Sequence, residues 1–505
     1  MINLMSGNPW GTGGLKPANP ASFSRFILPF SYTLQAIQER KQFGRNKELY
    51  FKSIPTADFD RERIRYFTSE TAEVLYGRAV WGQIPEDVWD SNKERCGSFS
   101  FNAQKSGQTL LIKIAQPWVV LFEGRKQGGT HELLQNGFLI LETYLDSENR
   151  TASLDDMLEF NDLFRFFDIP YTDHFKGYVE ALSDFPSDYS TGQKISYCSH
   201  DLQFLEYKNS WLSLLRLPLY QDDTWYSMVP AQSLEHEKKN DLECHLDCGK
   251  NKCLIYADNR AFVWTCAIVE KGAHTLCEKY SMNVEEPWES GHWLRLLNVD
   301  SPGDTPRQSH SGIKKFEKEW LKKRTYLRWT DEGTYYGYCY HSGAMLAPSS
   351  SPIPLWFHFG QMYFDQIVLL FYLRITLFAF SRDLTYLNDD NEVIFLQKEF
   401  KNLRHSFAKF TNLYQFPLIS NQQQGVEMYD IARTHMDIED LFNDVKNEIT
   451  STHEFLAMNA TEKLDDMVFR LTIIGLIIAL FALPWEKCDR IFELIGHFFS
   501  CFGVK

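Results

Sequence analysis

The feature that most constrains this chain is an apolar run near its C-terminal end. The last residues read "RLTIIGLIIALFALPWEKCDRIFELIGHFFSCFGVK", and residues 471–485 carry no charge. Together with the preceding turn, 467–485 would form a helix of about 28 Å, close to the ~30 Å hydrocarbon core of a bilayer. Arg470 can reach the headgroups at one end, and Trp485 suits the interface at the other. The run predicts a membrane span; a buried core helix is the alternative, but one apolar on all faces is uncommon.

Two further runs are apolar but interrupted. The segment "IFELIGHFFSCFGV" (491–504) contains Glu493 and His497 and would be only about 21 Å long as a helix. It predicts a short, tilted or interfacial second span, so that 467–505 forms a two-helix transmembrane hairpin. Residues 355–384 are interrupted by His358, Asp365 and Arg374, which predicts a buried helix packed against other helices.

A long helical pattern leads into the first span. Residues 426–474 contain neither proline nor glycine, and apolar residues recur at helical spacing. One helix over 421–485 would be about 100 Å long. A lone helix of that length has nothing against which to bury its apolar stripe, so the pattern predicts a homo-oligomer in which copies of this helix pack together.

The first span has two distinguishable faces. One follows heptad spacing, polar before the membrane and apolar within it, and is predicted to face a shared pore: Asn459, Glu462, Asp466, Phe469, Ile473, Leu476 and Leu480. The other has small residues that let neighbouring helices approach closely: Thr472, Gly475, Ala479 and Ala482. The two faces predict a ring of spans, and simple lipid anchoring is the alternative.

Charge is concentrated in the same segment. The chain has a net charge of −14, which argues against direct nucleic-acid binding. Residues 426–469 hold eleven acidic and three basic residues. Four of the acidic residues fall on one helical face: Asp437, Asp440, Asp444 and Glu448. A solvated face is the simplest interpretation, and a divalent-cation site for Mg²⁺ between adjacent subunits is the alternative, because clustered carboxylates bind hard cations.

The chain upstream of these helices has mixed α/β character. Residues 1–20 are rich in glycine, proline and asparagine and predict a mobile arm; 21–354 predicts a cytoplasmic α/β domain, and 355–466 a helical region with the long stalk helix. Strands are expected within 109–122 and 137–145, and hairpins over 252–271 and 325–340. Ser153 followed by Asp156 predicts a capping box. The absence of a signal-like N-terminus and the scattered cysteines predict reduced thiols and a cytoplasmic location for this bulk.

Candidate chemistry is sparse. Four potential zinc ligands lie within ten residues: Cys244, His245, Cys248 and Cys253. Structural zinc sites usually combine two separate pairs of closely spaced cysteines, so ordinary thiols are the alternative. Residues 314–324, "KKFEKEWLKKR", form a basic patch, either a solvated helix face or a contact for anionic lipid or phosphate. No catalytic constellation is found, so the chain is predicted not to be an enzyme and to require no cofactor.

The helical half resembles the CorA family of membrane proteins. The likeness covers about residues 355–505 and is carried by "FDQIVLLFYLRITLFAFS", "FPLISNQQQGVEMYDIARTHMDIEDLFNDVKNEI" and the terminal hairpin. It implies a homopentamer with a cytoplasmic α/β funnel, a stalk helix continuing into a pore-lining span, and a second span. Magnesium channels of this family carry Gly-Met-Asn in the loop after the first span, whereas this chain reads "LPWEKCDRIF" there. That departure argues against magnesium selectivity.

CorA-like proteins without that motif and with enlarged cytoplasmic domains occur beside type III CRISPR systems, and "SRFILPFSYTLQ" is similar to that branch. The resemblance implies an antiviral effector of the inner membrane, gated by a nucleotide messenger that conjugates S-adenosylmethionine with AMP. A divalent cation (Mg²⁺) channel and a membrane-tethered enzyme are the competing hypotheses. The sequence does not indicate which residues bind the ligand.

Overall fold

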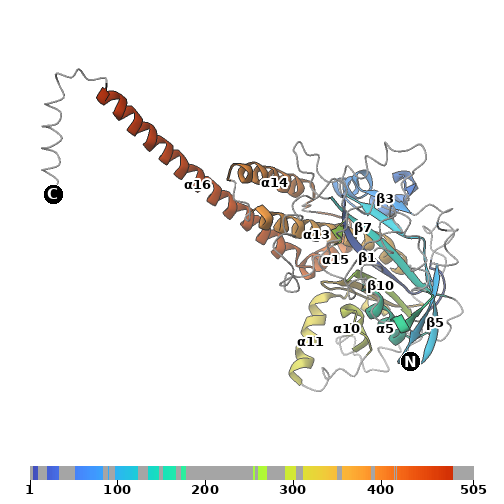
Figure 1. Ribbon diagram of the computed structural model, residues 1–505. Helices are drawn as coiled ribbons and strands as arrows, with labels where there is room; N and C mark the ends of the chain where they lie inside the picture. The colour runs from blue at the N-terminus through green and yellow to red at the C-terminus, as the bar shows by residue number, and fades with distance from the viewer. Residues whose placement is uncertain are drawn as a thin grey trace, which may run out of the picture. The chain divides into compact units, whose positions relative to one another are not determined.

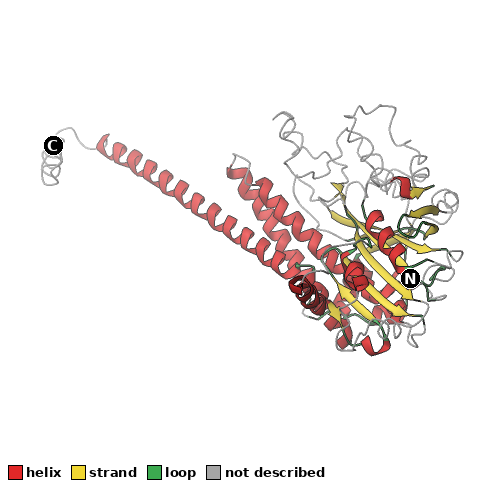
Figure 2. Ribbon diagram, turned by 90° about the horizontal axis from the view of Figure 1, so that it is seen from below, coloured by secondary structure: helices red, strands yellow, loops and turns green. Residues whose placement is uncertain are grey.

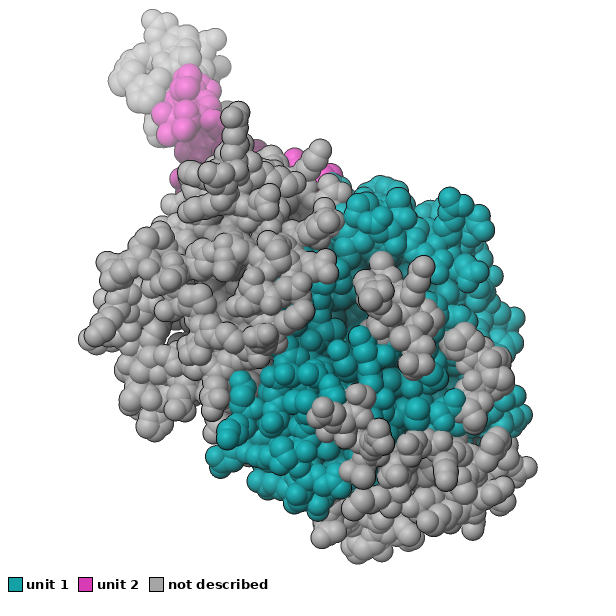
Figure 3. Space-filling model, turned by 90° about the vertical axis from the view of Figure 1, so that its right-hand side faces the viewer, with its two compact units in different colours: residues 1–379, 406–442 teal, residues 380–405, 443–505 magenta. Residues whose placement is uncertain are grey.

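The protein divides into two compact units. Unit 1 is Met1–Ala379 with Ser406–Phe442, and unit 2 is Phe380–His405 with Asn443–Lys505 (Figure 3). Residues on both sides of the domain boundary predicted near residue 354 belong to unit 1. The computed structural model describes residues 4–9, 20–32, 52–83, 89, 97–122, 135–146, 152–166, 172–177, 254–255, 260–269, 291–302, 311–349, 355–387, 393–414, 416 and 418–481.

Unit 1 is built on one mixed sheet of 13 described strands (Figure 1). The main path runs β11-β12-β13-β10-β1-β7-β5-β4-β8, and only β10–β13 is parallel among the described pairings. The strands are β1 (Phe23–Tyr32), β2 (Lys52–Ser53), β3 (Val80–Gln83), β4 (Ser98–Ala103), β5 (Gln108–Ile114), β6 (Trp118–Leu121), β7 (Gln135–Leu145), β8 (Phe175–Lys176), β9 (Leu254–Ile255), β10 (Phe262–Val269), β11 (Thr325–Tyr326), β12 (Tyr335–Tyr338) and β13 (Ser342–Pro348).

Helices cover both faces of this sheet (Figure 2). Successive side chains of a strand point to opposite faces. On β1, Phe26 packs edge-on against Phe160 and Phe164 of α5 (Leu154–Phe164), whereas Arg25 lies over the ring of Phe364 on α13 (Phe364–Leu387). The alternation places the α5 layer on one face and the α13 layer on the other. All eight residues of β10 are buried, as expected for a strand covered on both sides.

The remaining helices are short in the N-terminal half and long in the C-terminal half. Two segments, η2 and η8, have π-helical geometry. The other elements are η1 (Thr56–Asp58), α2 (Arg61–Arg65), α3 (Ser69–Ala72), η2 (Glu73–Arg78), η3 (Thr172–His174), α10 (Gly291–Asn298), α11 (Ser311–Arg324), η7 (Thr330–Glu332), α12 (Leu355–His358), η8 (Phe359–Tyr363), α14 (Val393–Tyr414), α15 (Gln423–His435) and α16 (Ile438–Phe481).

Several predictions of local structure from the sequence are confirmed. Ser153 and Asp156 form the expected capping box at the start of α5. The strands expected within 109–122 and 137–145 are β5, β6 and β7. The hairpin over 325–340 is also confirmed: β11 pairs antiparallel with β12, and Gly333 adopts the left-handed conformation (φ 67°) in its turn.

The hairpin expected over 252–271 is wrong. Antiparallel pairing joins β9 to Phe30 and Ser31 of β1, and β10 to Phe23–Ile27 of the same strand. Because β7 pairs along β1 from Phe23 to Tyr32, β9 and β10 share the other edge and lie in line with each other. A strand has two hydrogen-bonding edges, and here β1 rather than a local turn supplies the partner for both segments.

Of the arm predicted over residues 1–20, residues 4–9 contact the sheet, and residues 1–3 and 10–19 lie outside the described residues. Leu4 is buried and bridges to Val269 at the end of β10. The backbone N–H of Met5 donates to the carbonyl of Ile268, and that of Gly7 donates to the carbonyl of Leu145. These backbone hydrogen bonds satisfy groups at the sheet margin and explain why a segment of low hydrophobicity is ordered there.

The interrupted apolar run is a core helix, as its sequence predicts. Within the described residues, Leu355–Thr385 is the one helix found to be long and apolar enough to cross a membrane, and 83% of its most apolar window is buried within the protein. Phe371 stacks on Phe138 of β7, and Tyr372 stacks on Phe122 beside β6. The sheet therefore supplies the apolar surroundings that this helix needs.

The single long helix expected from residue 421 is broken. The first part, α15, ends at His435, and α16 begins at Ile438 after Asp437, whose φ of 55° lies in the left-handed region. Met436 is buried at the break, and His435 Nε2 lies 2.8 Å from the carbonyl oxygen of Lys323. These contacts fix the end of α15, so the segment forms two helices rather than one. Helix α16 still has 44 residues, about 66 Å.

Unit 2 is held by contacts among α13, α14 and α16. The Ser381 hydroxyl donates weakly to Glu448 at 3.4 Å. His453 of α16 stacks on the ring of Phe400 and lies 3.0 Å from a guanidinium nitrogen of Arg404. Beyond these contacts, the described side chains of α16 between Ala457 and Ala479 are all exposed.

The packing between the parallel strands β10 and β13 can be tested at Gly343 of β13. A methyl group at this position would overlap the ring of Trp264, which faces it across the β10–β13 pairing. We expect Gly343→Ala to lower the free energy of unfolding by about 1–3 kcal/mol, the usual cost of overpacking. Chemical denaturation measures it, with Gly475→Ala as the control because nothing lies within 4 Å of that position. Equal stability of the two variants would contradict the packing described here.

Candidate functional site

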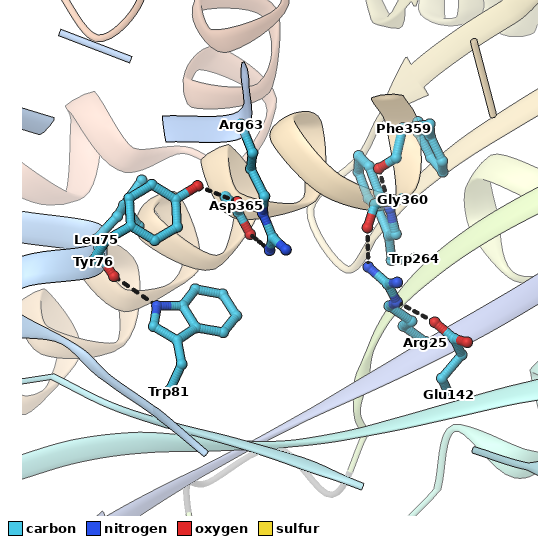
Figure 4. Close-up of polar contacts among 10 residues, drawn as sticks. All are labelled: Arg25, Arg63, Leu75, Tyr76, Trp81, Glu142, Trp264, Phe359, Gly360 and Asp365. Atoms are coloured by element: carbon cyan, nitrogen blue, oxygen red, sulfur yellow. Dashed lines mark hydrogen bonds and ion pairs between the residues drawn. The ribbon is translucent and has the colours of Figure 1, made fainter. Parts of the chain in front are cut away.

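A buried ion pair fixes the start of α13 to the N-terminal segment. Arg63 of α2 donates from Nε and Nη2 to the two carboxylate oxygens of Asp365, both at 2.5 Å (Figure 4). The Tyr76 hydroxyl, from η2, donates to the same carboxylate. Asp365 is fully buried and Arg63 is 3% exposed. A charge removed from water is tolerated only with such complete pairing, so this cluster joins two segments 302 residues apart.

The electrostatics of this cluster match its geometry. Burial by itself lowers the pKa of Arg63, but the adjacent Asp365 raises it above the ordinary value. Burial, and then the charge of Asp365, raise the pKa of the Tyr76 hydroxyl well above its usual value. The arginine therefore stays charged, and the tyrosine remains a neutral donor to the carboxylate.

A second buried pair holds the π-helical turn η8. Arg25 of β1 donates to Glu142 of β7 at 2.6 Å and also to the carbonyl oxygen of Gly360 (Figure 4). The indole of Trp264 on β10 donates to the carbonyl of Phe359 at 3.1 Å. A π-helical turn shifts backbone carbonyls out of the usual helical pairing. Arg25 and Trp264 of the sheet donate hydrogen bonds to two of these carbonyl groups and so fix where α13 begins.

Both pairs border one small hollow. Its lining includes Arg25, Arg63, Trp118, Glu142 and Phe364. The two arginines are matched by Glu142 and Asp365, so the formal charge of the cluster is zero. An anion entering here would have to displace a carboxylate. The arrangement is therefore suited to positioning α13 against the sheet.

The apolar end of α16 is the most unusual surface of the protein. Between Met467 and Ile478, large apolar side chains are 44–64% exposed, and they point to all sides of the helix. They are Met467, Val468, Phe469, Leu471, Ile473, Ile474, Leu476, Ile477 and Ile478. Soluble monomers rarely expose a contiguous apolar surface of this kind. This segment therefore needs a covering from lipid, from further copies of the chain, or from both.

The predicted faces of the first span fall on this helix. Glu462, Asp466, Phe469, Ile473 and Leu476 are exposed, as are Thr472, Gly475 and Ala479. Asn459 and Leu480 are helical positions whose side chains lie outside the described residues. A single chain does not distinguish a pore face from a packing face, so both assignments stay predictions. Ala482, the end of the first run and the second run at 491–504 also lie outside the described residues.

The acidic face is only partly continuous. Asp440, Asp444 and Glu448 lie on α16 and are exposed, whereas Asp437 lies in the break before it. In the described part of the chain, no group of three or more His, Cys, Asp or Glu side chains is placed to hold a metal ion. A site between subunits stays a prediction. The zinc candidates Cys244, His245, Cys248 and Cys253 lie outside the described residues.

In the sequence, Asp365 and Arg374 stand out only as interruptions of an apolar run. Arg374 donates to the carbonyl of Tyr340 and lies 3.5 Å from the centre of that ring. Asp365 and Arg374 therefore each have a partner from another segment. A carboxylate inside an apolar helix is itself a signal of a buried partner, but it does not indicate which arginine pairs with it.

No family model matches the chain, and comparisons with curated proteins and with solved structures give no match either.

Proposed function

We propose that this protein is a homo-oligomeric membrane effector whose α16 enters the bilayer and whose sheet unit lies in the cytoplasm. A small nucleotide ligand of the S-adenosylmethionine–AMP type would bind the cytoplasmic part and open a pore or disrupt the inner membrane. The observation that carries the membrane part is the exposure of the apolar end of α16 on all sides. The antiviral and nucleotide parts rest on the resemblance to CRISPR-associated CorA-like proteins.

Lipid would suit the end of α16 because the exposed apolar side chains of this helix lie on all of its faces and not on one face only. A helix that packs on one partner needs one apolar face, whereas a bilayer contacts every face. Asp466 and Arg470 pair at 2.9 Å just before the apolar residues, on a part of the helix that is exposed. Charged residues at this position suit a headgroup region. The second span rests on the apolar run at 491–504 and on the resemblance, whereas the pentameric number comes from the resemblance alone.

The length of α16 supports the proposed assembly from several copies. The helix has 44 residues, and its acidic and apolar parts are both exposed in the single chain. Small residues at Thr472, Gly475 and Ala479 let two such helices approach closely within a membrane. Neighbouring copies would thus bury what one chain leaves uncovered.

Ligand control requires a path from the cytoplasmic unit to the membrane helix. A ligand shifts a conformation only if it prefers one arrangement over another. Helix α13 begins at the buried ion pairs of unit 1, and its last residues belong to unit 2. In this proposal, ligand binding displaces the start of α13 and the rigid helix carries the displacement toward α16.

Leakage from liposomes tests the proposal. Purified full-length protein is reconstituted into vesicles containing a small dye and, in parallel, a Mg²⁺ indicator, and a panel of adenine-based messengers is added. We expect release of dye or bulk ions only with one messenger. Selective Mg²⁺ flux without any messenger would overturn the proposal and favour a cation channel, despite the loop "LPWEKCDRIF".

A further inference from the structure

Helix α11 presents a basic surface in an acidic protein. Residues 314–324 include six basic and two acidic residues, while the whole chain carries −14. One side of the helix is anchored, because Leu321 is buried and Trp320 packs against the core cluster. The other side is open: Lys315, Lys322 and Lys323 are exposed, and Phe316 is 66% exposed. The fold therefore holds a basic, partly apolar face outward in a fixed orientation.

The C-terminal end of α11 lies beside the junction of α15 and α16. His435 at the end of α15 approaches the carbonyl of Lys323, and the charge of Asp437 acts on Arg324. Arg324 lies 4.1 Å from the centre of the Trp320 ring, which keeps its guanidinium against the helix. The basic helix is thus anchored next to the start of the acidic one.

Acidic side chains near the start of α16 have no ion-pair partner among the residues that the structure describes. Asp440 and Asp444 are exposed and make no ion pair with the described residues, and the same holds for Lys315 and Lys322. Residues 426–469 hold eleven acidic and three basic residues. Bringing several copies of this segment together would cost free energy through repulsion between like charges. An oligomer therefore needs a source of positive charge at this level of the helix.

We propose that the basic face of α11 in one copy binds the acidic face of α16, at Asp440 and Asp444, in a neighbouring copy. This inference rests on the proposed oligomer. Opposite charges on two anchored helices give the contact its register, and Phe316 adds an apolar contact. The same contact can repeat from copy to copy around a ring, because every copy has one basic and one acidic helix. It offsets the repulsion that the α16 segments would otherwise feel.

Charge reversal tests the contact in full-length protein kept in a neutral detergent. Lys315→Glu with Lys322→Glu, and separately Asp440→Lys with Asp444→Lys, should each weaken self-association about tenfold at low salt. A mixture of the two variants should restore association, because each then finds an opposite charge. Mass photometry across a salt series measures this. Lys401→Glu with Lys409→Glu is the matched control, since both lysines are exposed on α14 and the net charge changes equally.

Three outcomes would overturn the inference. The first is association of the α11 variant equal to that of the control. The second is unchanged association with lost binding to phosphatidylserine vesicles, which would make α11 a lipid contact. The third is dissociation by chelation of Mg²⁺ with no effect of the α11 charges, which would assign the acidic face to a cation. Flotation of the wild-type chain with phosphatidylcholine vesicles reports membrane entry separately, so failure of the proposed function is distinguishable.

Discussion

Replacing Asp365 with asparagine is expected to lower the free energy of unfolding of unit 1 by about 3–5 kcal/mol, because the change leaves the Arg63 charge buried without its counter-charge. Asp365 is fully buried and receives hydrogen bonds from Arg63 and from the Tyr76 hydroxyl. Guanidinium denaturation followed by tryptophan fluorescence measures the loss, since the Arg63 guanidinium lies 5.7 Å from the Trp81 ring centre. This loss of stability is larger than the one expected for Gly343→Ala.

Two further variants distinguish the loss of the buried ion pair from the loss of any carboxylate. Asp331→Asn removes an exposed carboxylate from the turn before β12 and should change stability by less than about 0.5 kcal/mol. The double variant Arg63→Met with Asp365→Leu removes both charges and should be less destabilised than Asp365→Asn, because no unpaired charge is left. A loss for Asp365→Asn no larger than for Asp331→Asn would show that the cluster does not anchor α13.

Two aspartates in the apolar end of α16 should abolish membrane binding. Ile474 and Ile477 are 51% and 45% exposed and lie in the middle of the apolar segment. An aspartate near the centre of a transmembrane helix costs about 2.5–3.5 kcal/mol, so Ile474→Asp with Ile477→Asp should cost about 5 kcal/mol or more. Flotation of the full-length protein with phosphatidylcholine vesicles should show the variant left in the dense fraction, and vesicle leakage should be lost with it.

The matched control adds the same two charges elsewhere on the same helix. Thr450 and Thr461 are exposed positions of α16 before its apolar end. Thr450→Asp with Thr461→Asp should float like the wild-type chain, because neither position would enter the bilayer. If Ile474→Asp with Ile477→Asp also floats, the apolar end is covered by protein and the membrane proposal is wrong.

The sequence predicted a buried helix over the interrupted apolar run, but not the partners of the charged residues in it. Asp365 stands within residues that are otherwise apolar, so burial with a counter-charge is the reasonable expectation. Arg63 is 302 positions away, and several other arginines were equally eligible. Similarly, Arg25 stands out as a charge in a strand, yet its bonds to Glu142 and Gly360 depend on which strand lies beside β1 and which turn lies above it.

What the sequence by itself determined is local. The Ser153 capping box, the turn ending at Gly333, the core character of the helix beginning at Leu355 and the apolar end of α16 each depend on residues a few positions apart. Tertiary structure alone decided the break at Asp437 and the alignment of β9 and β10 along one edge of β1. The physical reason is that hydrogen-bond edges and packing faces are satisfied by whichever distant segment the topology brings near. Periodicity in one segment carries no information about that partner.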